Sequence, residues 1–461
     1  MNVGLVSSII GNLPEVTSPT EKRQGFKQKL IWTLIMLVAY FILAQVPLYG
    51  LGANALQTFE QLSIILGASF GSIISLGIGP IVTASIVLQL LTGSGLLKLD
   101  TSTPEGRKFF QGLQKLLGLF FVIFEAIVYV YLGGLSPQVG IHPMVLVGQL
   151  ILGGILIMLM DEVITKWGFG SGISLFIVAG VSQSILIQAF SPLVDLTTAD
   201  GGAAVGQFFW NSPLPPVGQV LVFFISLMAT DVQSAALALG AILATVLVFV
   251  FAVYAQAMKI EIPLTFGRAR GHGIRWPLSF LYTSNIPVIL IAALLANVQI
   301  AGQLLNKPGI VDWVNPPNIL QSIILVFFRN PFPWTTILPR VLVYVLLMVV
   351  GSVIFSIFWV QTSGMDAGSQ AKQIMNSGLQ IPGFRRDERV LERILQRYIF
   401  PLTVMGGITV GILAALADVS GALSRGTGIL LAVMILYKMY EDIARQHMMD
   451  MHPAMQKFLG G

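Results

Sequence analysis

Residues 75–91 read SLGIGPIVTASIVLQLL, an apolar stretch without a charged side chain. A run of this length can cross the hydrocarbon core of a membrane as a helix. Gly77, Gly79 and Pro80 interrupt its first part, and residues 54–71 before it form an apolar piece too short to span. Irregular backbone at membrane depth is tolerated only where it is buried in protein or lines a cavity. The stretch therefore predicts a broken span beside a cavity, preceded by a short re-entrant helix.

The rest of the 461-residue chain is equally apolar. Hydrophobic residues make up 55% of it and charged residues 10%, whereas a soluble domain carries about 25% charged residues. This composition excludes a soluble globular protein and predicts an all-α polytopic membrane protein. Ten apolar runs are long enough to span, namely 30–47, 73–91, 116–132, 144–160, 173–190, 235–257, 280–298, 341–360, 398–417 and 427–444.

The spans divide into two sets of five, 30–192 and 235–445, on either side of an external loop at 193–234. An odd number of spans in each set places the two halves in opposite orientations, as in inverted repeats. Two shorter apolar pieces, 219–229 and 318–328, predict interfacial or re-entrant segments.

The basic residues support this topology. If the N-terminus is cytoplasmic, the outward-facing links hold only four of the 26 Lys and Arg, which are Lys307, Arg329, Arg340 and Arg425. Cytoplasmic loops of membrane proteins carry an excess of Lys and Arg. The segments 1–29 and 446–461 are therefore predicted to be cytoplasmic, the first of them amphipathic, and most of the net charge of +5 reflects topology.

Two of the inward-facing loops are long and basic. In the loop 259–279, the Lys-Ile-Glu-Ile alternation predicts a strand that leads to a basic tip. The loop 362–397 carries six further Lys and Arg. Such loops bind acidic lipid or a large polyanion such as ribosomal RNA, although the topology signal alone accounts for them equally well.

Catalytic and metal sites are poorly supported. Residues 67–71 match the G-x-S-x-G pattern of a serine hydrolase around Ser69, but no histidine lies inside a span to act as its base. The chain has no cysteine, which excludes disulfides, thiolate metal sites and a cysteine nucleophile. GFGSG at 168–172 lacks the preceding strand and following lysine of a phosphate-binding loop. We therefore predict neither an enzyme nor a cofactor.

An inverted-repeat secondary transporter of a small solute is the alternative. Ion-driven carriers place charged side chains within their spans, and here Glu125 is the only acidic residue well inside one. Several other polar side chains in the spans are neutral, and taken singly each is expected to form a hydrogen bond between helices. They include Thr83, Ser85, Gln89, Ser182, Gln183, Asn285 and Asn297.

Four separated motifs resemble one known family. They are GIGPIVTASIVLQLL in the second span, GFGSGISLFI at the fifth, SNIPVIL in the seventh and PGFRRDERV in the second long loop. Together they resemble SecY, the channel-forming alpha subunit of the Sec protein translocase, in its archaeal form. The resemblance extends over essentially the whole chain. It implies a passive channel that passes unfolded secretory polypeptides across the membrane and releases hydrophobic segments sideways into lipid.

The resemblance also implies a pore ring of aliphatic side chains. Ile78 and Val82 are four residues apart and share a helix face, and Ile173 and Ile177 repeat that spacing. Ordinary helix packing explains such pairs by itself. The positions that correspond to the ring are Ile78, Val82, Ile173, Ile177, Ile289 and Leu431, and those that correspond to the plug below it are about 56–68.

Three further features follow from the resemblance. A lateral gate between the second and third spans and the seventh and eighth corresponds to Thr83, Gln89, Glu125 and Asn297. Ribosome docking, including contact with ribosomal RNA, corresponds to Arg268, Arg270, Arg275, Arg385 and Arg386. The implied partners are a SecE-type gamma subunit, a small beta subunit, the ribosome, signal sequences with their nascent polypeptides, and membrane lipid.

Overall fold

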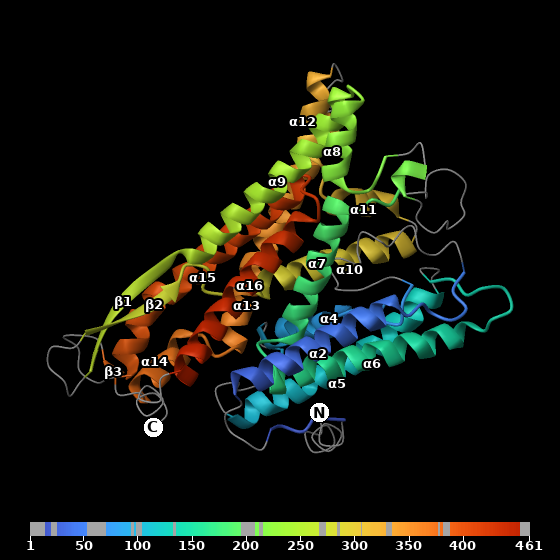
Figure 1. Cartoon of the computed structure of the whole chain (residues 1–461). Coiled ribbons are helices and arrows are strands. Elements are labelled where there is room, and N and C mark those ends of the chain that lie inside the picture. The colour runs from blue at the N-terminus through green and yellow to red at the C-terminus, as the bar shows by residue number, and fades with distance from the viewer. Residues whose placement is uncertain are drawn as a thin grey trace.

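Within the residues that it describes, the computed structural model contains ten long helices (Figure 1), one for each predicted span. It describes residues 14–19, 25–52, 71–93, 96–97, 104–131, 135–194, 208–211, 215–266, 273–283, 286–305, 307–328, 334–376, 379–380 and 388–451. The first five long helices are α2 Phe26–Gln45, α4 Gly79–Gly93, α5 Pro104–Tyr131, α6 Pro143–Trp167 and α7 Gly172–Phe190. The second five are α9 Val232–Ala257, α10 Ile286–Leu304, α13 Trp334–Thr362, α15 Glu388–Val419 and α16 Gly426–Met451.

Among the described residues, seven of these helices are long and apolar enough to cross a membrane by length and composition. The shorter helices α4 and α10 are equally apolar. The second half of α16 carries Lys438, Glu441 and Asp442, which lower its hydropathy. The expected all-α membrane architecture is therefore confirmed.

Several helices are longer than the predicted spans. α5 begins at Pro104 where the span was expected from 116, and α15 begins at Glu388 where it was expected from 398. Arg389, Arg393 and Arg397 thus lie on α15 and not in the loop before it. The hydrocarbon core limits only the apolar part of a helix, and charged residues continue the same helix into water.

Two predicted span starts are too early. Residues 71–78 form consecutive turns, so α4 begins only at Gly79 and not at 73. α10 begins at Ile286 and not at 280, because the chain to Ser279 belongs to a strand and Phe280 donates its N–H to Met258. An apolar run does not distinguish a strand or turn from a helix by hydropathy alone.

Three strands form a small sheet in the order β2-β1-β3. β1 Lys259–Phe266 contains the strand that the alternation at 259–262 predicted, and it is antiparallel to β2 Gly273–Ser279, with Lys259 opposite Ser279. The two-residue strand β3 Leu379–Gln380 pairs with the end of β1 through Phe266 and Thr265. The sheet therefore joins the two long basic loops.

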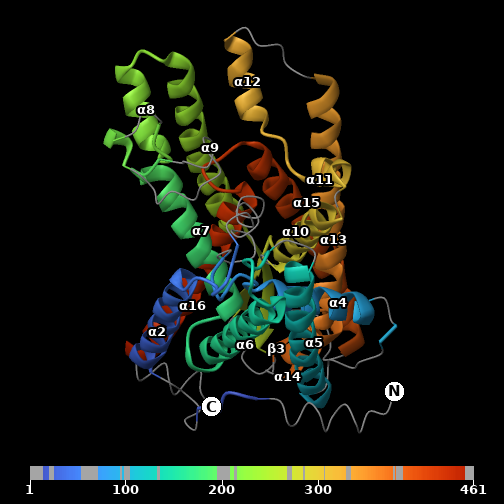
Figure 2. The same cartoon turned by 90° about the vertical axis from the view of Figure 1, so that its right-hand side faces the viewer.

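The shorter helices lie at both ends of the molecule. Figures 1 and 2 both show the sheet and α14 Ala367–Asn376 at one end, and α8 Gln219–Met228 and α12 Ile319–Phe327 at the opposite end. α8 and α12 are the two short apolar pieces of the sequence. The remaining short helices are η1 Phe209–Asn211 and α11 Pro308–Val314.

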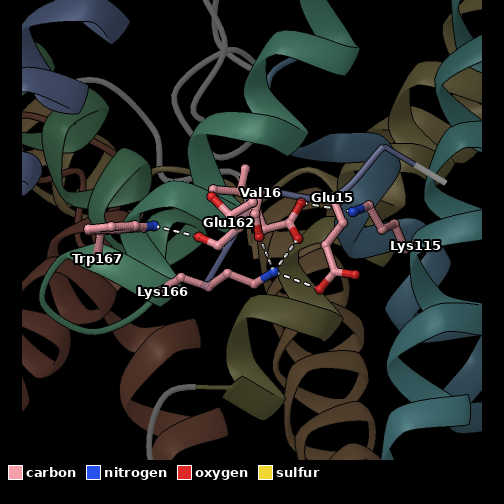
Figure 3. Close-up of polar contacts among 7 residues, drawn as sticks. Glu15, Val16, Lys115, Glu162, Lys166 and Trp167 are labelled. Carbon is pink, nitrogen blue, oxygen red and sulfur yellow. Dashed lines mark hydrogen bonds and ion pairs between the residues drawn. The ribbon is translucent and has the colours of Figure 1, made fainter. Parts of the chain in front are cut away.

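The chain before α2 is attached to the end of α6 (Figure 3). The Lys166 ammonium donates to a Glu15 carboxylate oxygen at 2.6 Å and to the Val16 carbonyl at 2.6 Å. Trp167 donates its indole N–H to the Thr17 carbonyl at 2.9 Å. The hydrogen bond from Lys166 and its positive charge hold the pKa of Glu15 below its usual value.

Lys166 also belongs to an ion-pair network between α5 and α6. It lies 2.8 Å from one oxygen of Glu162, and Lys115 of α5 lies 2.8 Å from the other. At the same end, Lys259 at the start of β1 pairs with Glu441 of α16 at 2.6 Å. The chain before α2, the sheet and the last part of α16 therefore share one end of the molecule.

Candidate functional site

The two halves of the chain meet in a single apolar cluster. Five of the six expected ring residues are buried members of it, with at most 8% of their surface exposed, and Ile173 packs against it half-buried. They come from the turn before α4, from α4 itself, and from α7, α10 and α16, so that both halves contribute. The buried five are Ile78, Val82, Ile177, Ile289 and Leu431.

The turns at 71–78 place Ile78 at the start of α4. The N–H of Gly77 bonds to the Ile74 carbonyl at 2.8 Å, and that of Gly79 to the Leu76 carbonyl at 3.2 Å. Gly77 has a φ of +54°, a conformation that glycine adopts without a steric penalty. The break in the helix therefore has its own backbone hydrogen bonds, and Ile78 remains 1% exposed.

The six expected ring side chains cannot form polar contacts. The six aliphatic groups have no hydrogen-bond donor or acceptor, and a constriction lined by such groups blocks ions because it does not hold water. Within the part of the chain that the structure describes, no group of three or more His, Cys, Asp and Glu could hold a metal ion. The expected ring residues therefore form a buried aliphatic group between the two halves.

A polar group bridges the halves beside this cluster. The Asn297 amide of α10 donates to the Thr83 hydroxyl of α4 at 2.9 Å, and this hydroxyl lies 3.1 Å from a Glu125 carboxyl oxygen of α5. The same hydroxyl also lies 2.9 Å from the Gly79 carbonyl. Thr83 has one proton to donate, so it bonds to either Gly79 or Glu125 while it accepts from Asn297. Three of the four expected gate residues therefore form one network.

Gln89, the fourth expected gate residue, lies outside that network. It is six residues beyond Thr83 on α4, about 9 Å along the helix, and is 3% exposed. Its Oε1 has no hydrogen-bond partner among the described residues. A different glutamine, Gln114 of α5, donates to Ser85 of α4 at 2.6 Å. Sequence reasoning missed Gln114, because it precedes the predicted span and gives no signal of its own.

The expected docking and plug residues are only partly described. Arg275 lies in β2 opposite Pro263 of β1. The plug range 56–68 and four of the expected docking residues, Arg268, Arg270, Arg385 and Arg386, lie outside the described residues. However, β3 ends at Gln380, and its pairing with β1 brings the second basic loop against the first.

Comparisons with known proteins agree with this architecture. The SecY family profile matches residues 72–440, and that of the plug domain of Sec61p matches residues 38–71. The chain is 43% identical to the protein translocase subunit SecY of Methanothermobacter thermautotrophicus and 41% identical to that of Pyrococcus furiosus. Each alignment covers 97% of both chains.

Solved structures show the same fold. The structure of a protein conducting channel matches with a TM-score of 0.80 at 38% identity, over 97% of this chain and 98% of that one. Sec61 in the canine ribosome-channel complex from the endoplasmic reticulum matches with a TM-score of 0.77 at 37% identity, over the same shares. With profile, sequence and fold in agreement over nearly the full length, the chain belongs to the SecY family.

Proposed function

We propose that this chain is the channel subunit that passes unfolded secretory polypeptides across the membrane and releases hydrophobic segments laterally into lipid. The observation that carries the proposal is the apolar cluster to which both halves contribute. The relatives are named protein translocase subunits, and a neighbouring structure is a protein conducting channel. These findings favour a passive channel over a small-solute transporter and over an enzyme.

The apolar ring is proposed to act as the seal of the channel. Aliphatic side chains resist ions through dewetting. They also offer no hydrogen bonds that would favour one passing sequence over another, as a channel for many different polypeptides requires. The segment at 56–68 is proposed to seat as a plug below the ring, in line with the match of residues 38–71 to a plug domain.

The contact of α4 and α5 with α10 and α13 is proposed to be the lateral gate. The Asn297–Thr83 hydrogen bond joins its two sides. A hydrogen bond between membrane helices stabilises their association by about 0.6–2 kcal/mol. This is weak enough for a hydrophobic signal sequence to compete for the opening.

Loss of the bridge is expected to ease gate opening. Thr83→Val or Asn297→Leu removes a free energy of about 0.6–1.7 kcal/mol. We therefore expect a secretory reporter with a weakened signal sequence to be translocated roughly threefold to fifteenfold more efficiently. Translocation into membrane vesicles measures the effect.

Gln114→Leu is the matched control for this test. It removes a hydrogen bond between α5 and α4, which lie on the same side of the proposed gate. Translocation of the weakened reporter is expected to stay at the wild-type level. Equal gains from Gln114→Leu and Asn297→Leu would contradict a gate at this seam.

The end that carries the sheet is proposed to face the cytoplasm and to bind the ribosome. β1 and β2, which flank the basic tip in the sequence, and β3, which precedes Arg385 and Arg386, belong to this one sheet. Both chain termini are proposed to lie on this side, in agreement with the distribution of basic residues. A similar Sec61 is part of a ribosome-channel complex, and we propose the ribosome, a SecE-type gamma subunit and a small beta subunit as partners.

Cysteine crosslinking tests the proposed channel, because the chain has no native cysteine. One cysteine replaces Ile78, and another is placed in a stalled secretory nascent chain. A disulfide is expected for nascent chains long enough to reach the ring, because a translocating polypeptide must pass within contact distance of Ile78. Gel mobility under non-reducing conditions measures it.

Leu152→Cys provides the control for this crosslink. Leu152 lies on α6 with 56% of its surface exposed, away from the cluster. Its crosslink to the same nascent chains is expected to be absent. Failure of position 78 to crosslink at every chain length, in membranes shown to hold ribosomes, would favour the transporter.

A further inference from the structure

Each half carries a pair of adjacent glycines in its fourth span, followed in both by isoleucine. A Cβ atom added to Gly153 of α6 would overlap the carbonyl oxygen of Ile73, in the chain that leads into α4. A Cβ atom added to Gly406 of α15 would lie 3.1 Å from the carbonyl oxygen of Phe280, in the chain that leads into α10. α4 and α10 are the second spans of their halves, so the first glycine of each pair has the equivalent neighbour.

The second glycine of each pair contacts the third span of its half. A Cβ atom on Gly154 would lie 2.7 Å from Cγ1 of Val122 on α5. A Cβ atom on Gly407 would lie 2.8 Å from Oγ of Ser356 on α13. The two glycine pairs therefore contact equivalent spans in the two halves, so α15 is the counterpart of α6.

An aspartate follows each glycine pair on the same helix. In α6, an Asp161 carboxylate oxygen accepts the N–H of Ile173 at 2.9 Å. In α15, an Asp418 carboxylate oxygen accepts the N–H of Thr427 at 2.7 Å. The other oxygen of Asp418 accepts from the Thr427 and Tyr344 hydroxyls. Each carboxylate thus satisfies an N–H at the start of the next helix, α7 or α16, where no intrahelical acceptor exists.

The two aspartates lie on the same helix face relative to their glycine pairs. Asp161 lies eight residues after Gly153, and Asp418 lies twelve after Gly406. The difference of four residues is about one helical turn, so both side chains leave their helices on the same face.

A glycine at the first position of each following helix permits the close approach. A Cβ atom on Gly172 would lie 2.5 Å from Cα of Asp161, and one on Gly426 would overlap the backbone of Ala417. In both halves the bonded N–H belongs to the residue directly after this glycine. The helix start is therefore fixed against the end of the preceding span by one carboxylate and one glycine.

One expected ring residue on each of these helices has the same offset from the fixed start. Ile177 lies five residues after Gly172, and Leu431 lies five after Gly426. α7 starts beside Phe169, whose ring is 5.4 Å from that of Phe26 at the start of α2. Nine spans separate the start of α2 from that of α16, so α7 and α16 enter the cluster from opposite ends of the molecule.

We infer that Asp161 and Asp418 are a pair of positioning residues, one in each half, which set the axial register of α7 and α16. They thereby hold Ile177 and Leu431 at the level of the ring. The effect on ion leak rests on the proposed ring, whereas the effect on register does not. An apolar helix in lipid or in an apolar cluster has few directional contacts along its axis, so a polar bond at its start specifies the register.

A disulfide pair reports the register directly. A Cβ atom on Gly428 of α16 would lie 3.1 Å from Cγ2 of Val181 on α7, within the reach of a disulfide. A disulfide between Gly428→Cys and Val181→Cys is therefore expected when α16 is in its native register. A disulfide between Ala432→Cys and Val181→Cys is expected when α16 is displaced along its axis by one turn. The ratio of the two yields in native membranes measures the register.

Asp161→Ala and Asp418→Ala are each expected to lower this ratio roughly fivefold, the population shift that corresponds to loss of one helix cap. Asn at either position keeps an acceptor oxygen for the backbone N–H and is expected to restore most of the ratio. The matched control is Asp231→Ala. Asp231 accepts from Ser234 at the start of α9, a helix without a ring residue. If Asp418→Ala does not accumulate, Thr427→Val replaces it as the test of the positioning role of Asp418, because this variant removes one donor to the same carboxylate.

Resting ion leak, measured on the same variants after reconstitution, separates this inference from the proposed ring. A lower ratio with a raised leak supports both. A lower ratio with an unchanged leak supports the positioning role and contradicts the ring. A ratio equal to that of Asp231→Ala for both aspartate variants overturns the positioning role, whatever the leak.

Discussion

Replacement of Ile78, Ile173 and Ile177 by glycine is expected to raise the resting ion leak of the channel at least about tenfold. A tenfold rise requires only about 1.4 kcal/mol less barrier. Removal of three branched side chains from one cluster widens the passage and admits water, which carries ions. Ile78 and Ile177 are almost fully buried, each with 1% of its surface exposed. Conductance of planar bilayers that contain the purified channel measures the leak.

Ile187→Gly is the control for the leak experiment. Ile187 lies on α7, as do two of the replaced residues, but 47% of its surface is exposed. A glycine there weakens the helix by about as much, roughly 1 kcal/mol, without opening the cluster. Baseline conductance of the triple variant would show that the ring is wrongly assigned.

Charge reversal at Arg385 and Arg386 to glutamate is expected to weaken ribosome binding roughly fiftyfold at about 0.1 M salt. Each basic contact with a nucleic-acid backbone releases close to one counterion, so two lost contacts reduce the salt exponent by almost two. Cosedimentation of ribosomes with the reconstituted channel, over a series of salt concentrations, measures both the affinity and the exponent.

Arg393→Glu with Arg397→Glu makes the same change in net charge nearby. Both side chains are exposed on α15, outside the proposed docking segment. A small loss of affinity is expected from general electrostatics. An equal loss from both double variants would attribute the binding to overall positive charge and remove the specific role of the Arg385 and Arg386 pair.

The membrane architecture followed from the sequence because hydropathy and charge act locally. An apolar run of sufficient length must form a helix in lipid to satisfy its own backbone. Each of the ten predicted runs accordingly overlaps one long helix of the described residues. The strand at 259–266 was equally predictable, since its alternation is a local property.

The positions of the helix starts were less predictable. Hydropathy could not show that residues 73–78 form turns or that the chain to 279 is a strand. Residues 73–78 are as apolar as a span, and the conformation of the chain before α10 depends on hydrogen bonds such as that of Phe280 with Met258.

In the candidate site too, some features followed from the sequence and others depended on tertiary packing. The family motifs identified Thr83, Glu125 and Asn297, and the structure brings these three into hydrogen-bond distance. The motifs also grouped Gln89 with them, although it points to a different level of α4 and does not join the network. Gln114 had no motif at all. Which polar side chains meet across a helix pair depends on the rotation and height of both helices.

The sequence by itself determined the class of molecule and the number of spans, because local composition and motifs carry both, and it predicted the residues of the proposed ring. Only the tertiary structure decided that the two basic loops share one sheet. It alone decided too that Asp161 and Asp418 bond to the helix starts beyond them. The physical reason is that such contacts join segments whose distance and orientation are set by packing, about which neighbouring residues in the chain carry no information.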